Sequence, residues 1–211
     1  IRPIILCGGE GTRLWKKSTN NEPKQFINFG GWNLFEKTLK RIKGPLFDYP
    51  IISTNVKYLK KIKFYLKKNK FNKYRIVLEP AKRNTGPAVL SAALVPDIPI
   101  KQPLLFLPSD HLLEKNNVFN KNLIKNSKYL NNKNIFLFGI KPDNPSKEYG
   151  YLNVKKSGSH LIKIVKFIEK PSVKKAKALI KTKGLWNSGM FFARKDSIIN
   201  NFRKFEKKIL K

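Results

Sequence analysis

Short apolar runs of strand length alternate with segments of helical spacing through the first two thirds of this 211-residue chain. Five runs have the length and composition of buried strands: 3–9, 50–55, 74–80, 103–110 and 134–142. Four segments between them carry apolar residues at steps of three and four, with lysines on the other face: 33–44, 58–71, 85–95 and 119–130. Because strands and helices that alternate in this way build parallel sheets, we predict an α/β protein with an open, largely parallel sheet covered on both sides.

The last third of the chain changes character. Three further segments are strand-like, with turns between them: 149–156, 160–171 and 189–195. A short helix is expected at 173–181 and an amphipathic basic helix at 196–211. We interpret this part as a mixed extension of the sheet that could close over a site. No linker rich in Pro, Gly or Ser divides the chain, so residues 1–211 are expected to form a single domain.

Cysteine, histidine and hydropathy exclude several classes of protein. Cys7 is the only cysteine, which excludes an internal disulfide, and its place at the end of an apolar run indicates a small buried side chain. With two histidines, no Cys/His zinc cluster can form. No apolar stretch approaches the roughly 20 residues that span a bilayer, and the N-terminus has no secretory pattern. We therefore expect a cytoplasmic protein without a membrane partner.

The formal net charge of +32 invites a nucleic-acid interpretation, because lysine and arginine neutralise phosphates. Only seven of the 45 cationic residues are arginine, however, and the lysines are scattered along the whole chain. Base readout and bidentate phosphate recognition favour arginine, and a general bias toward lysine, asparagine and isoleucine explains this composition at least as well. We expect no specific nucleic-acid partner, and a positive field that attracts anionic ligands.

A glycine-rich turn follows the first predicted strand, where Gly8, Gly9 and Gly11 precede Thr12 and Arg13. A strand, a glycine turn and a helix place backbone N–H groups around a phosphate at the positive end of a helix dipole. The spacing does not match a dinucleotide fingerprint, because leucine stands at the third glycine position, and no Gly-Lys-Ser/Thr follows as in a P-loop. Taken alone, the turn is equally well explained as a plain connection between strand and helix.

Seven segments in a fixed order make the pattern specific. The chain resembles the sugar-nucleotide pyrophosphorylases, and within them the mannose-1-phosphate guanylyltransferases, in GGEGTRLW (8–15), PKQF (23–26), EPAKRNTGPA (79–88), LPSDH (107–111), FGIKPDNPSKEYGYL (138–152), FIEKP (167–171) and WNSGMF (186–191). The resemblance implies a Rossmann-like nucleotidyltransferase fold with a mixed, mostly parallel central sheet flanked by helices. It also implies that GTP and α-D-mannose 1-phosphate are converted to GDP-mannose and diphosphate by in-line attack on the α-phosphorus, with Mg²⁺ as cofactor.

The resemblance implies a nucleotide site built on the glycine turn. Five residues at the end of the first strand and in the turn would wrap the nucleotide and its phosphates: Cys7, Gly8, Gly9, Gly11 and Thr12. Arg13 and Lys24 are the expected catalytic residues, because two cations can stabilise the charge that develops on the α-phosphate and on the leaving diphosphate. Taken alone, Lys24 could equally be a solvated surface lysine.

Guanine chemistry suggests how the base is selected. Guanine offers two neighbouring donors, N1–H and the 2-amino group, and one carboxylate can accept from both. Glu79 is the candidate for this contact, with Asn84 and Thr85 lining the same loop. The alternative is that Glu79 pairs with Lys82 or Arg83.

Asp110 ends the apolar run 103–110, so its carboxylate is expected at the carboxyl edge of a central strand, where ligands bind in open α/β sheets. A hard oxygen ligand there suits Mg²⁺ held jointly with triphosphate oxygens. The alternative is that Asp110 caps the following helix. Ser109, Asp110 and His111 are not expected to act as a hydrolase triad, because neighbouring residues of a strand point to opposite faces.

Four residues match the family positions that hold the sugar phosphate: Gly150, Glu169, Lys170 and Asn187. Glu169 can accept hydrogen bonds from sugar hydroxyls, Lys170 can pair with the 1-phosphate, and Asn187 can both donate and accept. Lys170 has a plainer alternative as a surface charge before a proline.

The chain departs from the family pattern at Gly86 and at its C-terminal end. Gly86 stands where the family has alanine, a change from which we expect little effect. The family continues to a second aspartate that helps bind the metal, and no residue here takes its place. We therefore expect a piece of a longer enzyme, truncated at the C-terminal end and impaired in GTP binding and turnover.

Three alternatives stay open. A related pyrophosphorylase could use another base and sugar, as thymidylyl and uridylyl transferases do, although EPAKRNTGPA and WNSGMF favour the guanylyl-mannose type. A basic nucleic-acid-binding protein would have interleaved aromatic and arginine clusters, which the sequence lacks. A non-catalytic regulatory relative would not need Arg13, Lys24, Asp110 and Lys170 together. The sequence also leaves open whether the protein is a homo-oligomer.

Overall fold

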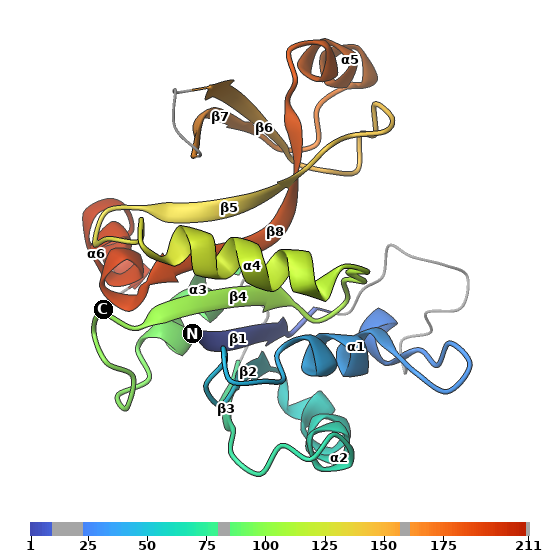
Figure 1. Cartoon of the computed structure of the whole chain (residues 1–211), viewed down its shortest axis with the longest axis vertical. Helices are drawn as coiled ribbons and strands as arrows, with labels where there is room; N and C mark the ends of the chain where they lie inside the picture. The colour runs from blue at the N-terminus through green and yellow to red at the C-terminus, as the bar shows by residue number, and fades with distance from the viewer. Residues whose placement is uncertain (10–22, 80–84, 157–160, 210–211) are drawn as a thin grey trace. The chain divides into compact units, whose positions relative to one another are not determined.

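The computed structural model describes residues 1–9, 23–79, 85–156 and 161–209 (Figure 1). The chain divides into two compact units: Ile1–Phe136 together with Phe191–Lys211 form the first, and Leu137–Met190 form the second. Strands β5 (Ile135–Ile140) and β8 (Leu185–Arg194) contribute residues to both units. That the whole chain is a single domain stays a prediction.

The sheet of the first unit has parallel strands at its centre, in the order β3 (Arg75–Leu78), β2 (Ile51–Thr54), β1 (Arg2–Cys7) and β4 (Pro103–Pro108). The C-terminal part of β8 pairs with β4 in the antiparallel direction, from Phe191 opposite Phe106 to Arg194 opposite Pro103. The predicted α/β fold, with a mixed and mostly parallel sheet, is therefore confirmed.

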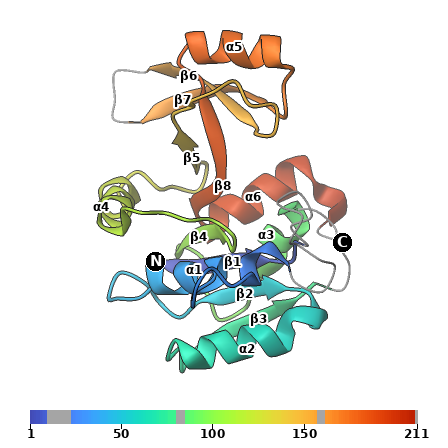
Figure 2. The same cartoon turned by 90° about the vertical axis from the view of Figure 1, so that its right-hand side faces the viewer.

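Both faces of this sheet are buried, as predicted. Helices α3 (Thr85–Ala93) and α6 (Lys195–Phe205) lie side by side on one face (Figure 2), where Ile4 and Phe106 join their core. Ile5 and Leu105, which alternate with these residues, are fully buried on the other face. The remaining helices of the unit are α1 (Leu34–Arg41), α2 (Leu59–Lys68) and α4 (Asn116–Ser127). None of the helices in the described part of the chain is long and apolar enough to cross a membrane.

An aromatic cluster anchors the segment that carries Lys24. This segment, Lys24–Phe26, is a short 3-10 helix. The Phe26 ring is 1% exposed and packs against Phe35 of α1 and Tyr65 of α2, with ring centroids 5.5 and 5.9 Å away. A buried side chain two positions along the chain therefore fixes the backbone of Lys24.

The second unit is an antiparallel arrangement with one helix. β6 (Tyr151–Lys156) pairs with β7 (Ile162–Ile168) and also with the start of β8, where Tyr151 lies opposite Trp186. Helix α5 (Val173–Lys181) has the predicted bounds, and a small core of Tyr151, Ala176 and Leu179 holds it on the strands.

Two elements differ from the sequence prediction. β8 begins at Leu185, earlier than the expected residue 189, so the WNSGMF segment lies on a strand although Asn, Ser and Gly have low strand propensity. Helix α6 ends at Phe205 and a 3-10 turn follows at Lys207–Ile209, so the helix predicted for 196–211 is too long. Residues 203–209 are exposed, and an amphipathic pattern without packing does not sustain a helix.

Gly86 and Gly139 allow a matched test of how closely side chains pack around a glycine in each unit. An alanine Cβ at Gly86, in the first turn of α3, would lie 3.8 Å from the Phe202 ring, an ordinary contact. Gly86→Ala should raise the free energy of unfolding by about 0.4–1 kcal/mol, because alanine has less backbone entropy to lose. A Cβ at Gly139 would lie 2.5 Å from Leu185 Cδ1, so Gly139→Ala should lower that free energy by about 1–3 kcal/mol. Urea unfolding measures both changes. Equal changes in the free energy of unfolding for the two variants would contradict the contacts described at these glycines.

Candidate functional site

The carboxyl ends of the parallel strands gather the predicted nucleotide residues. β1 leads into Gly8, β3 into Glu79 and β4 into Asp110, while Thr85 is exposed at the start of α3. The backbone N–H of Glu79 donates to the Thr54 carbonyl at 2.8 Å, so the ladder continues past the end of β3. Ligands bind at this edge in open α/β sheets. Some predicted residues lie outside the described part of the chain: Gly11, Thr12, Arg13 and Asn84.

Lys24 and Asp110, predicted as separate ligands for phosphate and for metal, form an ion pair. Lys24 Nζ lies 3.1 Å from Asp110 Oδ2, with 20% and 29% of the two side chains exposed. Because the pair is partly exposed, each charge is compensated and yet free to exchange its partner for an incoming ligand. The alternative that Asp110 caps a helix is wrong, because the next helix, α4, begins at Asn116.

The imidazole of His111 lies beside this pair without joining it. His111 Nε2 is 3.8 Å from Asp110 Oδ1, too far for the hydrogen bond that a hydrolase triad needs. Burial lowers the pKa of His111 below its usual value, against the opposing effect of the Asp110 carboxylate, and the Lys24 and Arg41 charges lower it further. The neutral form of the imidazole is therefore favoured.

Gln25 connects the Lys24 segment to the glycine turn, a role that the sequence analysis did not assign. Its amide is 2% exposed, and Nε2 donates to the Gly9 carbonyl at 3.2 Å and to Cys7 Sγ at 3.8 Å. The backbone at the end of β1 is thus held by the residue next to Lys24. The sequence signal for this role was the position of Gln25 between a charged and an aromatic residue in the PKQF segment.

Cys7 is a structural side chain. It is fully buried, as predicted, and burial raises the pKa of its thiol to about 12. The Cys7 carbonyl accepts a hydrogen bond from Thr54 Oγ1 at 3.1 Å. Any contact of Cys7 with a nucleotide therefore involves its backbone, and the thiol is not a nucleophile.

The Glu79 carboxylate lies against Gly8. A Cβ on Gly8 would be 2.8 and 2.9 Å from the two Glu79 carboxylate oxygens, so only glycine fits there with the carboxylate in this place. The buried Ser53 hydroxyl donates to Glu79 Oε1 at 2.8 Å and fixes its orientation. Ser53 was not assigned from the sequence, because its partner is remote in the chain. The alternative partners at positions 82 and 83 lie outside the described part of the chain.

Three of the predicted sugar-phosphate residues cluster in the second unit. The N–H of Asn187 donates to the Gly150 carbonyl at 2.8 Å, and Asn187 Oδ1 accepts from the Gly189 N–H at 3.2 Å. A Cβ on Gly150 would lie 2.8 Å from Glu169 Oε2, so a carboxylate again occupies the space beside a glycine. Gly150, Glu169 and Asn187 are thereby brought together.

Lys170 has an unusual backbone. Its φ is +41°, in the left-handed region that long side chains rarely adopt, although it precedes Pro171. Its ammonium lies 3.9 Å from a Glu169 carboxylate oxygen and 41% of the side chain is exposed. Strained backbone of this kind costs free energy and is common at ligand sites, which favours a functional role over a plain surface charge.

The donor set at Asp110 fits a magnesium ion that is shared with a substrate. Asp110 offers one partly exposed carboxylate. The described residues contain no group of three or more His, Cys, Asp or Glu side chains that could hold a metal by themselves. Mg²⁺ is often held by one or two carboxylates together with substrate phosphates, so the residues present are consistent with such an ion.

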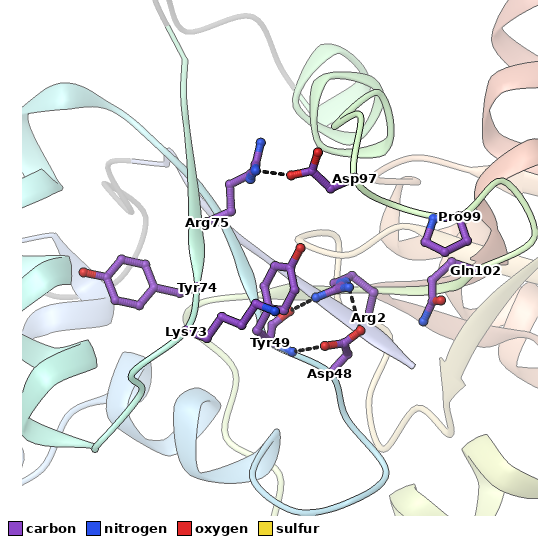
Figure 3. Close-up of a pocket in the computed structure, with 9 residues that line it drawn as sticks. All are labelled: Arg2, Asp48, Tyr49, Lys73, Tyr74, Arg75, Asp97, Pro99 and Gln102. Atoms are coloured by element: carbon purple, nitrogen blue, oxygen red, sulfur yellow. Dashed lines mark hydrogen bonds and ion pairs between the residues drawn. The ribbon is translucent and has the colours of Figure 1, made fainter.

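A pocket of about 520 Å³ lies at the opposite, amino edge of the first unit's sheet (Figure 3). Each of its arginines is paired with an aspartate: Arg2 with Asp48 at 2.5 Å, and Arg75 with Asp97. Arg2 also stacks over the Tyr49 ring, 3.5 Å from its centroid. The two arginines of this pocket are thus compensated, the Lys73 ammonium lies over the Tyr49 ring, and the pocket lies at the far ends of the strands from the candidate site.

Comparison with known proteins agrees with this geometry. The nucleotidyl transferase family matches residues 2–211. The chain is 33% identical to the alginate biosynthesis protein AlgA of Pseudomonas fluorescens over 97% of its length, and 32% identical to a mannose-1-phosphate guanylyltransferase of Klebsiella pneumoniae over 100%. It spans 44% and 46% of the lengths of these two relatives.

Two crystal structures share the fold over 99% of the chain. Mannose-1-phosphate geranyltransferase from Thermus thermophilus has a TM-score of 0.83 and 25% identity, with 61% of that protein covered. Mannose-6-phosphate isomerase from Helicobacter pylori has a TM-score of 0.82 and 29% identity, with 76% covered. The predicted fold class and the predicted family are both confirmed.

The burial of Cys7 predicts its reactivity. Because the thiol is inaccessible and its pKa is raised to about 12, a disulfide reagent such as Ellman's reagent should leave the folded protein unlabelled at pH 8. After unfolding in guanidinium chloride, the same thiol should react fully, since its pKa returns to about 8.5. Rapid labelling of the folded protein would contradict the position of Cys7 under the glycine turn.

Proposed function

The chain belongs to the nucleotidyl transferase family, and from that premise we propose that it forms GDP-mannose and diphosphate from GTP and α-D-mannose 1-phosphate. The observation that carries the proposal is the Lys24–Asp110 pair, which Gln25 connects to the glycine turn at the end of β1. The pair offers a cation for phosphate oxygens and a carboxylate for Mg²⁺ in one place. The choice of guanine and mannose draws support from the relative named mannose-1-phosphate guanylyltransferase.

The reaction requires two polyanions to approach each other. An oxygen of the sugar 1-phosphate attacks the α-phosphorus of GTP, the bond to the bridging oxygen on the opposite side breaks, and diphosphate leaves. No protein nucleophile is needed, so positioning and charge neutralisation supply most of the catalysis. We assign the stabilisation of the α-phosphate and of the leaving group to Lys24, and also to Arg13, which lies outside the described residues.

Asp110 is the residue that would hold Mg²⁺. When bound, the ion supplies positive charge to the triphosphate oxygens. Lys24 compensates the Asp110 carboxylate in the ion pair, and on nucleotide binding its ammonium turns to the phosphates. The carboxylate and the ammonium thus exchange one partner for another, and neither is left uncompensated in a partly desolvated site.

Glu79 supports guanine as the base. Its carboxylate is fixed by Ser53 and rests on Gly8, at the edge where the nucleotide would bind. A carboxylate accepts from both donors of guanine, whereas it repels the carbonyl oxygens that flank N3–H in uracil and thymine. This contact favours a guanylyl transferase over a uridylyl or thymidylyl transferase.

The second unit supports the sugar-phosphate part of the proposal. The Glu169 carboxylate lies beside Gly150, whose carbonyl accepts a hydrogen bond from the Asn187 N–H, so a hydroxyl acceptor and an amide lie in one cluster. Lys170 follows directly in the chain, and its ammonium lies 3.9 Å from the Glu169 carboxylate. We assign Glu169 and Asn187 to the sugar hydroxyls and Lys170 to the 1-phosphate.

Asp110→Asn tests the proposed reaction. Magnesium-dependent release of diphosphate from GTP plus mannose 1-phosphate should fall by about 100-fold or more, because a neutral amide is a poor ligand for Mg²⁺. A coupled diphosphate assay measures the rate, and circular dichroism checks the fold. Asp143→Asn, at an exposed aspartate of the second unit, is the matched control and should keep full activity. Equal activity of the two variants would remove Asp110 from the mechanism.

Glu79→Gln tests the base assignment. An amide presents a donor to one of the two guanine donors, so use of GTP should fall by about 10- to 100-fold. ITP, which lacks the 2-amino group, should be affected less, and the GTP-to-ITP preference in kcat/KM should narrow. Glu114→Gln, at an exposed site, is the control. A preference unchanged by Glu79→Gln would show that another group reads the base.

A further inference from the structure

Arg41 is a buried cation that the proposed mechanism does not use. It lies in the last turn of α1 and is 2% exposed. One guanidinium nitrogen, Nη2, donates to the His111 carbonyl at 3.0 Å. Its Nε and Nη1 atoms are buried and have no hydrogen-bond partner in the part of the chain that the structure describes. A guanidinium taken out of water with so few partners is destabilising, so its presence calls for a compensating role.

The one bond that Arg41 makes falls on the Asp110 turn. His111 follows Asp110 directly, and on the other side of Asp110 the Ser109 N–H donates to the Leu6 carbonyl at 3.2 Å. The carboxylate is therefore carried by a turn that is tied at both ends, to β1 on one side and to Arg41 on the other. Of these two ties, only Arg41 brings a charge.

This charge is the second reason to connect Arg41 with the ligand. Lys24 is already compensated by Asp110, whereas no carboxylate of the described residues pairs with Arg41. An uncompensated cation in a low-dielectric place acts over a longer range than an exposed one, since solvent and salt screen it less. It therefore lowers the cost of collecting the negative charge of a triphosphate at this edge.

We propose that Arg41 is a positioning residue for the triphosphate: it holds the Asp110 turn through the His111 carbonyl and supplies a fixed positive charge beneath the phosphate site. The inference rests on the proposed function only in placing a nucleoside triphosphate at Lys24 and Asp110. It differs from a structural role in one measurable respect. A structural arginine affects the binding of all ligands equally, whereas a phosphate-positioning charge matters more as phosphates are added.

Arg41→Met separates these roles, because methionine fills a similar space without a charge to bury. Replacing a buried charge by an apolar side chain often leaves stability unchanged or raised, so the thermal midpoint should not fall. Titration calorimetry with guanosine, GMP, GDP and GTP in Mg²⁺ measures the effect. The Kd for GTP should rise by about 10-fold and that for guanosine should not change, with GMP and GDP between them. Arg41→Lys, which restores the charge, should recover most of the loss.

Arg2→Met is the matched control. Arg2 is buried to the same degree, 3% exposed, but it lies at the amino edge and is paired with Asp48. The Arg2→Met variant should show the same dependence of Kd on the number of phosphates as the unmodified protein. If Arg41→Met does not fold, Arg41→Gln, which keeps a donor for the His111 carbonyl and removes the charge, takes its place in the same titrations.

The outcomes are distinct. Equal weakening of guanosine and GTP by the Arg41 variant, or no weakening of GTP, overturns the inference. If the unmodified protein binds GTP no better than guanosine, both this inference and the proposed function are wrong. If it binds GTP in a phosphate-dependent way but releases no diphosphate with mannose 1-phosphate, only the proposed function is overturned, and the Arg41 variants still decide the inference.

Discussion

The parallel register of β1 with β2 and β4 is the constraint on which the candidate site depends. Ile5 pairs with Ile52 on one side and with Leu107 on the other, so the three strands end together. Because side chains alternate along a strand, a slip of one residue would turn the buried side chains of β4 to the opposite face and shift the turn that carries Asp110 away from Lys24. The register is held by the buried faces of the strands, with Ile4 in the core beneath α3 and α6 and Ile5 on the other side. Apolar packing therefore fixes the position of the charged groups.

Charged side chains are paired differently at the two edges of this sheet. At the amino edge, Arg2 and Arg75 each have an aspartate partner. At the carboxyl edge, Lys24 pairs with Asp110 and the Glu79 carboxylate accepts from Ser53, whereas Arg41 has no acidic partner among the described residues. The net charge of +32 adds a general positive field at both edges. The proposed attraction of a polyanion to the carboxyl edge therefore rests on the unpaired charge of Arg41 and not on an excess of cations there.

Periodicity and strand length were sufficient to predict the α/β layers and the place of Asp110, because both are local properties of the chain. Gln25, Ser53 and Arg41 escaped prediction since their significance lies in remote partners: a glycine carbonyl, a carboxylate and the His111 carbonyl. The excess length predicted for the C-terminal helix has the same origin. Its amphipathic pattern continues, and only the folded chain shows that nothing in the described residues packs against its last turns.

The residues around the glycine turn change the explanation of why glycine stands at positions 8 and 9. A glycine in a phosphate-binding pattern is usually explained by the ligand, yet a Cβ at Gly8 would also displace the Glu79 carboxylate, and one at Gly150 would lie 2.8 Å from both Glu169 Oε2 and the Phe167 ring. Gly9 differs, because no atom of the described residues lies within 4 Å of a Cβ placed there. An alanine side chain at position 9 would therefore meet no atom of the described residues. With its carbonyl held by Gln25, the open backbone of Gly9 is consistent with the nucleotide contact that we propose for it.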